Sequence, residues 1–232
     1  PSDYSVSLTN GSLAITPATI TVAGISANNK VYNATTAATL NVGTITYSGV
    51  FAGDTVTVNT SNLSGAFTDK NVGNGKTVVI SGVILSGTSS ANYQLSGGAN
   101  TTTTANITPA PLSITGSSIT STYNASSQAL AAPTVTGLIA GDNVVVAGGA
   151  SGTNAGTYTA AYTATGVDAG NYTVTSNAPV LTINKASLVI SANNAGTFYG
   201  QVDPSLTAVV TGLQGSDTFS VISPSYTVTR AA

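Results

Sequence analysis

Residues 156–166 read GTYTAAYTATG, and this stretch indicates the class of fold. Tyrosine and alanine occupy the even positions from 158 to 164 and threonine most of the odd ones, the period of a strand buried on one face. The alternation recurs elsewhere, with inward side chains expected at Val56, Val58, Leu112, Ile114, Tyr172, Val174, Leu181 and Ile183. No segment keeps a helical apolar spacing, so we predict an all-β chain with at most one helical turn after Tyr32 or Tyr123.

The composition removes most kinds of catalytic site. The 232 residues include seven acidic side chains, all of them Asp, five basic ones, and no His, Cys, Met or Trp. Ser-His-Asp triads, Cys-His pairs, His or Cys metal sites and CxxC redox motifs therefore cannot form. Glycoside hydrolysis needs two carboxylates at a set separation, whereas each repeat described below carries one conspicuous Asp. We expect a protein that is not an enzyme and has no cofactor.

Charge and hydropathy exclude two classes of partner. The net charge is −2 and no basic run occurs, so we expect no nucleic acid partner. No apolar stretch approaches the roughly 20 residues of a spanning helix, so we expect no membrane insertion. The opening residues, PSDYSVSLTN, have neither the basic start nor the apolar block of a signal peptide, and we expect any export signal to lie outside this sequence.

Short motifs recur along the chain in a fixed order. A Tyr element comes first, as YNA at 32–34 and 123–125 and YGQ at 199–201, and a turn ending in Asp follows, as GVFAGD at 49–54, GLIAGD at 137–142 and GLQGSD at 212–217. The first two repeats continue with an Asn-Tyr strand and a closing strand. The repeated residues, which we take as a structural motif, are Tyr32, Tyr123, Tyr199, Tyr93, Tyr172, Asp54, Asp142 and Asp217.

The motif order divides the chain into two whole modules between two partial ones. Residues 18–110 and 111–186 are the predicted modules, residues 1–17 the closing strands of a preceding module, and residues 187–232 a partial module. Their lengths suit small β-sandwiches, Ig-like or similar, better than solenoid turns. The linkers are short, and two of them carry prolines, namely Pro17 in the first and Pro109 and Pro111 in the second, so we expect the modules to form a stiff, elongated rod.

These motifs resemble the YDG and MBG repeat modules of large bacterial surface proteins of the filamentous haemagglutinin type. KVYNATTAATL, GVFAGD and ANYQL resemble the YDG type, whereas GTNAGTYTAAYTATGVDAGNYTVT and YGQVDPSLTAVVTGLQGSD resemble the shorter MBG type. The Tyr-Asp-Gly that names the first family is Tyr-Asn-Ala here. The resemblance implies a stalk or spacer segment of a large secreted bacterial adhesin, at the cell surface or in a biofilm matrix, with neighbouring modules of the same chain as its partners.

The repeated tyrosines and aspartates have two interpretations. A buried Tyr packs its ring in the core and sends its hydroxyl to a backbone partner, while Asn, Asp or Gly beside it form a tight turn. Asp54, Asp142 and Asp217 also suggest a weak calcium hypothesis. A calcium site normally gathers several oxygens, often from more than one acid, and each turn offers one carboxylate, so we favour the turn.

Two other functions stay open as predictions. Strands such as TTTTANIT at 101–108 carry no charge to guard a sheet edge. The alternative function is therefore a self-associating extracellular fibre or matrix element, in which the partial module after residue 186 accepts strands like residues 1–17 from another copy. The lesser alternative is a module that binds surface polysaccharide, which needs exposed aromatic rings, whereas most tyrosines are expected to face inward.

Overall fold

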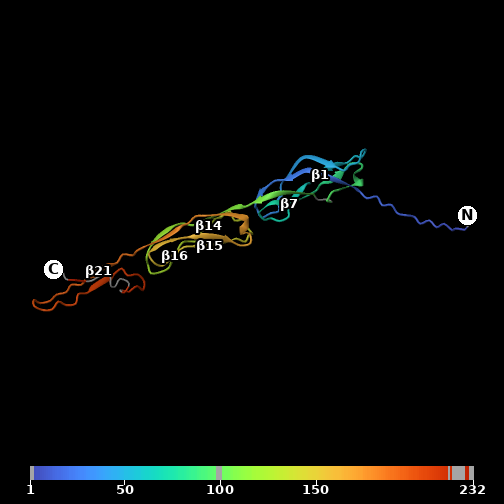
Figure 1. Cartoon of the computed structure of the whole chain (residues 1–232). Coiled ribbons are helices and arrows are strands. Elements are labelled where there is room, and N and C mark those ends of the chain that lie inside the picture. The colour runs from blue at the N-terminus through green and yellow to red at the C-terminus, as the bar shows by residue number, and fades with distance from the viewer. Residues whose placement is uncertain (1–2, 98–100, 219, 221–227, 230–232) are drawn as a thin grey trace. The chain divides into compact units, whose positions relative to one another are not determined.

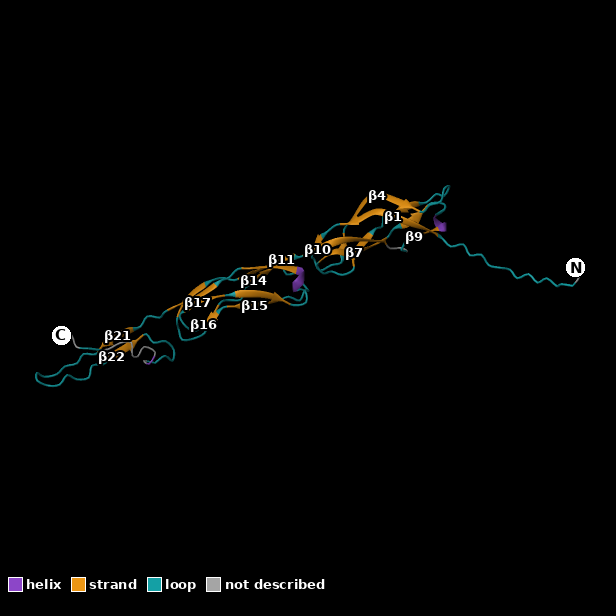
Figure 2. Ribbon diagram, viewed as in Figure 1, coloured by secondary structure: helices purple, strands orange, loops and turns teal. Residues whose placement is uncertain are grey.

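The computed structural model describes residues 3–97, 101–218, 220 and 228–229, and the chain divides into two compact units, Pro1–Ala110 and Pro111–Ala232 (Figure 1). Strands and loops make up both units (Figure 2). The described residues include two short 3-10 turns, η1 (Ser90–Asn92) and η2 (Ala169–Asn171). The predicted all-β class is confirmed. Neither turn lies after Tyr32 or Tyr123, where one was expected, and none of the described helical elements could span a membrane.

In the described part of the first unit, the strands form three groups. One sheet has the order β4-β1-β9, formed by β4 (Leu40–Ser48), β1 (Ala18–Ala27) and β9 (Tyr93–Leu95). The second has the order β2-β10-β7-β6-β3, formed by β2 (Lys30–Val31), β10 (Thr101–Thr108), β7 (Gly73–Ser81), β6 (Ser64–Phe67) and β3 (Ala37–Ala38). An antiparallel pair joins β5 (Thr57–Asn59) and β8 (Ile84–Ser86).

The second unit repeats these pairings. Its sheets are β14 (Thr134–Thr136), β11 (Ala110–Thr115) and β19 (Tyr172–Ser176) in that order, and β12 (Ile119–Thr122), β20 (Val180–Asn184) and β17 (Gly156–Thr159) in that order. Antiparallel pairs join β13 (Gln128–Ala129) to β16 (Ser151–Gly152) and β15 (Val145–Gly149) to β18 (Ala161–Thr165). A further pair, β21 (Val189–Ala192) with β22 (Ala208–Thr211), opens the third repeat.

The closing strand fixes the position of the Tyr element in each module. β10 runs parallel to β2, and β20 runs parallel to β12. The backbone N–H of Tyr32 then donates to the carbonyl of Thr108, and that of Tyr123 donates to the carbonyl of Asn184, at 2.8 Å in both cases. Each opening tyrosine therefore leaves the sheet where the closing strand ends, next to the linker that leads onward.

Most of the expected inward side chains lie in the core. Those that are fully buried or nearly so are Val56, Leu112, Ile114, Tyr172, Leu181 and Ile183. In the first unit Ile20, Val56 and Tyr93 form one cluster, which joins the β1 sheet to the turn before β5. Val174 was wrongly predicted to face inward, since it is 39% exposed on a strand that is buried only at its first residue.

The alternation in residues 156–166 is confirmed, but the stretch is not one strand. Tyr158 pairs with Leu181 in the β17–β20 ladder, whereas Tyr162 pairs with Gly148 in the β18–β15 ladder. Ala160, 2% exposed, lies between the two strands, and its N–H donates to the carbonyl of Pro179. The chain thus passes from one sheet to another at a small side chain, which keeps both tyrosine rings on the core side.

Two expectations about strands concern residues 101–108 and residues 3–17. The charge-free stretch 101–108 forms β10, which pairs with β7 from Thr101 to Ile107 and with β2 at Ile107 and Thr108. Residues 3–17, expected to be closing strands of a preceding module, have no assigned strand. Their apolar side chains are exposed, namely Tyr4, Val6, Leu8, Leu13 and Ile15.

Candidate functional site

The Asn-Tyr tyrosine closes the Asp turn inside the first module. The hydroxyl of Tyr93 donates a 2.5 Å hydrogen bond to Oδ2 of Asp54 and accepts one of 3.0 Å from the backbone N–H of Phe51. Asp54 N–H in turn donates to the Phe51 carbonyl at 3.1 Å. One tyrosine hydroxyl therefore connects both ends of the turn to the core, because the Tyr93 ring is only 7% exposed.

The second module builds the same arrangement from its own sequence. The hydroxyl of Tyr172 donates to Oδ2 of Asp142 at 2.6 Å and accepts from the N–H of Ile139 at 3.1 Å. The turns η1 and η2 come directly before Tyr93 and Tyr172, and both tyrosines then take extended backbone angles. The short helical turn reverses the chain so that the following tyrosine points into the module.

The opening tyrosines of the three repeats differ in exposure. Tyr32 is buried, and the Lys70 ammonium lies 5.8 Å from its ring centroid. Tyr123 is half-buried, and its hydroxyl donates a 2.9 Å hydrogen bond to Oδ2 of Asp217, in the Asp turn of the next repeat. Tyr199 is fully exposed. The structure thus brings Tyr123 and Asp217 together across the boundary between two repeats.

The Tyr-Asn-Ala turns carry strained backbones. Ala34 and Ala125 are the non-glycine residues with positive φ in the described chain, at 60° and 61°. This left-handed conformation normally favours glycine, because a Cβ approaches the carbonyl oxygen. Asn33 and Asn124 stabilise the turns by accepting backbone N–H bonds from Thr35 and Ser126, two residues on.

The boundary between the second and third repeats is closely packed around Tyr123. A Cβ added to Gly215 would lie 2.8 Å from the Cβ of Ala125, so the Asp turn of the third repeat lies against the Tyr-Asn-Ala turn of the second. Four residues separate β20 from β21. Beside the contact is an open groove of about 520 Å³, lined among others by Asn154, Lys185, Leu188, Gln214 and Asp217.

Two tyrosine hydroxyls in these contacts are held in their neutral form. Burial raises the pKa of Tyr93 above its ordinary value, and the hydrogen bond to Asp54 raises it further. For Tyr123 the hydrogen bond to Asp217 is the larger cause of a raised pKa, and burial adds to it. If either tyrosine lost its proton, the negative phenolate would face the carboxylate to which the hydroxyl now donates. This repulsion disfavours ionisation of the tyrosine.

The positions and hydrogen bonds of the acidic side chains are relevant to the calcium hypothesis. Within the described ranges no group of three or more acidic side chains comes together. Oδ2 of Asp54, Asp142 and Asp217 each accepts a tyrosine hydroxyl, so one oxygen of each carboxylate is already engaged. Each of these aspartates therefore connects its turn to a tyrosine hydroxyl.

Sequence reasoning missed other residues that organise the second module. Asp168 is 8% exposed, and its Oδ2 accepts the N–H of Asn143, next to the Asp turn. Asn177 binds Gly116 at both its N–H and its carbonyl, at 2.9 and 2.7 Å. The motif GVDAGN just before Tyr172 was a visible signal for Asp168, because Asp commonly starts such turns. Asn177 had no comparable local signal.

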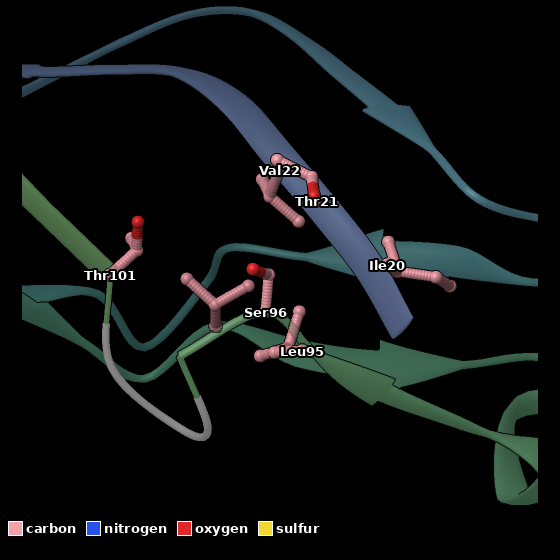
Figure 3. Close-up of a pocket in the computed structure, with 7 residues that line it drawn as sticks. Ile20, Thr21, Val22, Leu95, Ser96 and Thr101 are labelled. Carbon is pink, nitrogen blue, oxygen red and sulfur yellow. The ribbon is translucent and has the colours of Figure 1, made fainter. Parts of the chain in front are cut away.

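A small cavity lies in the first unit, where Ile20, Thr21 and Val22 of β1 face Leu95, Ser96 and Thr101 (Figure 3). Its volume is about 80 Å³. Small-molecule sites usually measure roughly 300–1,000 Å³, so this space is too small for a sugar ring.

Comparisons with known families agree with the repeated motifs. The model of the YDG domain matches residues 16–105, which include Tyr32, Asp54 and Tyr93. The model of the MBG domain of the YGX type matches residues 188–232, which include Tyr199-Gly200-Gln201. No curated protein and no solved structure matches the chain. The chain therefore contains a YDG domain at residues 16–105 and an MBG domain of the YGX type at residues 188–232.

Proposed function

We propose that the chain is a spacer segment in the stalk of a large secreted bacterial adhesin, where it supports cell-surface adhesion and biofilm formation. YDG and MBG domains are consistent with an adhesin-type extracellular repeat module. The stalk role needs joints that hold successive modules in a defined orientation. The observation that carries this proposal is the bond from Tyr123 to Asp217, with Gly215 packed on Ala125 beside it.

The physical argument concerns the linker. Four residues between β20 and β21 already limit the relative motion of two modules. A hydrogen bond from a half-buried tyrosine to a carboxylate adds a second connection at a distance from the linker, and two connections resist bending better than one. A stalk built in this way holds a distal adhesive part away from the cell surface, and this role needs neither catalysis nor a cofactor.

Small-angle X-ray scattering joined to light scattering, at low protein concentration, tests the stalk. We expect the mass of one chain and a profile with the cross-section of a single module. Tyr123→Phe should broaden the distribution of particle dimensions without unfolding either unit, because it removes one hydroxyl. Tyr47→Phe is a matched control, since its hydroxyl bonds Val56 inside the first unit. A compact profile for the unmodified chain contradicts the proposal.

A second candidate is the self-associating fibre or matrix element, and the exposed residues 3–17 favour it. Residues 2–18 align without a gap on residues 170–186, so Tyr4, Leu13 and Ile15 correspond to Tyr172, Leu181 and Ile183. The first three are 83–93% exposed, whereas the corresponding three are 0–7% exposed. A segment with this alternating apolar pattern suits addition, as a strand, to the sheet of another copy.

The proposal that residues 3–17 add as a strand to another copy, which we call strand supply, has its own test. Light scattering over a range of concentrations should show growing particles for the unmodified chain. Leu13→Ser combined with Ile15→Ser removes the apolar face and should abolish growth, whereas Ser12→Thr combined with Thr16→Ser changes the other face and should not. Growth that survives the loss of Leu13 and Ile15 removes this candidate.

A further inference from the structure

The open groove at the boundary between the second and third repeats has the size of a ligand site. Its volume of about 520 Å³ lies within the range of roughly 300–1,000 Å³ that small-molecule sites usually occupy. Its lining comes from three segments, namely the loop at 154–155, the linker at 185–188 and the Asp turn at 212–217. Leu188 and Leu213 supply apolar surface among polar side chains, so the groove offers both kinds of contact.

The groove holds one charge of each sign. Lys185 and Asp217 both line it, and in the described chain they form no ion pair with each other. The Lys185 ammonium has no hydrogen-bond partner among the described residues either, whereas that of Lys76 binds Asp69. Asp217 accepts the Tyr123 hydroxyl at Oδ2, and its Oδ1 accepts no hydrogen bond from any described residue. One cation and one carboxylate oxygen are therefore available to a ligand.

The linker of this boundary carries a lysine where the other closing motifs carry a proline. ITPA at 15–18 and at 107–110 places Pro17 and Pro109 where INKA at 183–186 places Lys185. Proline fixes φ and stiffens a linker, and lysine does neither. The chain has only five basic residues, so a cation at this position is unusual for the sequence and points to a role in the groove rather than in the linker.

Hydrogen bonds hold two walls of the groove in place. The Tyr158 hydroxyl donates to the Asn154 carbonyl at 3.0 Å, which fixes the loop. In the Asp turn, Nε2 of Gln214 donates to the Gly212 carbonyl at 3.0 Å, and the Asp217 N–H donates to the Gln214 carbonyl at 2.9 Å. The side-chain amide of Asn154 and Oε1 of Gln214 have no partner within the described ranges. Binding at these groups therefore needs little further ordering of the chain.

We propose that this groove binds an acidic polysaccharide, with a sugar carboxylate at the Lys185 ammonium and ring hydroxyls donating to Asp217. A polyanion without hydroxyl groups would face Asp217 with a like charge, and a neutral glycan would leave Lys185 without an opposite charge. A uronic acid residue carries both a carboxylate and hydroxyl donors, so it matches both side chains. An open groove also admits an internal residue of a long polymer. This inference goes beyond the stalk role and gives the polysaccharide alternative a site and a ligand class.

Titration with a galacturonic acid tetramer, followed by amide chemical shifts, tests this site. We expect shifts at residues 154–155, 185–188 and 212–217 and none in the first unit. Lys185→Gln removes the cation and should weaken binding about fivefold or more, whereas Lys185→Arg keeps the charge and should bind as the unmodified chain does. Lys76→Gln is the matched control, because it removes the same charge from the first unit and should leave binding unchanged.

Two further ligands identify what the groove recognises. The methyl ester of the same tetramer keeps the ring hydroxyls without the charge and should bind about fivefold more weakly or worse. A tetra-aspartate peptide keeps the carboxylates without the sugar rings and should not bind. The proposal is overturned if the ester or the peptide binds as well as the acid, if the tetramer does not bind at millimolar concentration, or if Lys185→Gln leaves binding unchanged.

The groove and the stalk use the same boundary between repeats, but their tests fail separately. Small-angle scattering without any ligand reports on the stalk alone. An extended profile together with no tetramer binding overturns the groove and leaves the stalk standing. A compact profile contradicts the stalk, and tetramer binding that depends on Lys185 would then still support the groove.

Discussion

The hydroxyl of Tyr123 lies 2.9 Å from Oδ2 of Asp217, although the two residues belong to successive repeats. Inside the first two modules Tyr93 and Tyr172 bind the Asp turns of their own modules. The Asp of this turn thus accepts a hydrogen bond from two kinds of tyrosine. One kind belongs to the same module and closes it, and the other belongs to the preceding repeat and connects the two repeats. This dual use explains why Tyr and Asp both recur in a chain with so few charges.

Gly215→Ala should loosen the boundary between the second and third repeats. Its methyl group would lie 2.8 Å from the Cβ of Ala125, and its φ of 50° already disfavours a side chain. We expect a cost of about 1–3 kcal/mol to the packing of this boundary. Limited proteolysis should then cut the segment 185–188 faster. Gly196→Ala in the same repeat, with no atom near its Cβ position, should leave the rate unchanged.

Tyr172→Phe and Tyr162→Phe form a matched pair. Both rings are buried, at 7% and 8% exposure, but Tyr172 bonds Asp142 and Ile139 whereas the Tyr162 hydroxyl has no partner among the described residues. Loss of the Tyr172 hydroxyl should lower the free energy of unfolding by about 2 kcal/mol. Loss of the Tyr162 hydroxyl should change it by less than about 0.5 kcal/mol or raise it. Urea denaturation measures both, and equal losses would refute the role of the Asp turn.

Alkaline pH should weaken the Tyr–Asp contacts. Raised pKa values of Tyr93 and Tyr123 mean that the folded state favours the neutral hydroxyl. The two Tyr–Asp contacts therefore contribute fully to stability below the pKa of tyrosine in the unfolded chain, about 10. This contribution is lost as pH rises through the higher pKa values of the folded state. Tyrosinate absorbance should show late-titrating tyrosines. Asp217→Asn should move one of them to lower pH, and a titration unchanged by this substitution contradicts the contact.

Ala34→Gly should stabilise the first unit and Ala125→Gly the second. Glycine relieves the left-handed strain at φ of 60° and 61°, although it gains entropy in the unfolded chain. We expect a net gain of about 0.5–1 kcal/mol at each site. Ala38→Gly on β3 is the control and should destabilise, because a strand gains nothing from a glycine. Thermal unfolding of the three variants shows whether each substitution raises or lowers the stability of its unit.

The sequence predicted the strands well where one face is buried. Leu112 and Ile114 alternate with polar residues and are fully buried, as periodicity requires. It failed at Val174, because alternation alone does not reveal which end of a strand the core covers.

The motif residues were identifiable, but their pairing was not. Repetition singled out Tyr93, Asp54, Tyr123 and Asp217. A backbone partner was expected for the opening tyrosine, whereas Tyr123 bonds a carboxylate of the following repeat. That bond joins residues far apart in sequence and depends on how β20 leads into β21, which no short motif encodes.

A distance measurement between two spin labels tests the central claim most directly, namely that Tyr123 and Asp217 fix the joint between successive repeats. The chain has no Cys, so Thr157→Cys on β17 and Ser191→Cys on β21, both exposed, accept labels selectively. At low concentration we predict one narrow distance distribution, which Tyr123→Phe broadens and Tyr47→Phe does not. A broad distribution that is the same with and without the Tyr123 hydroxyl would contradict the account.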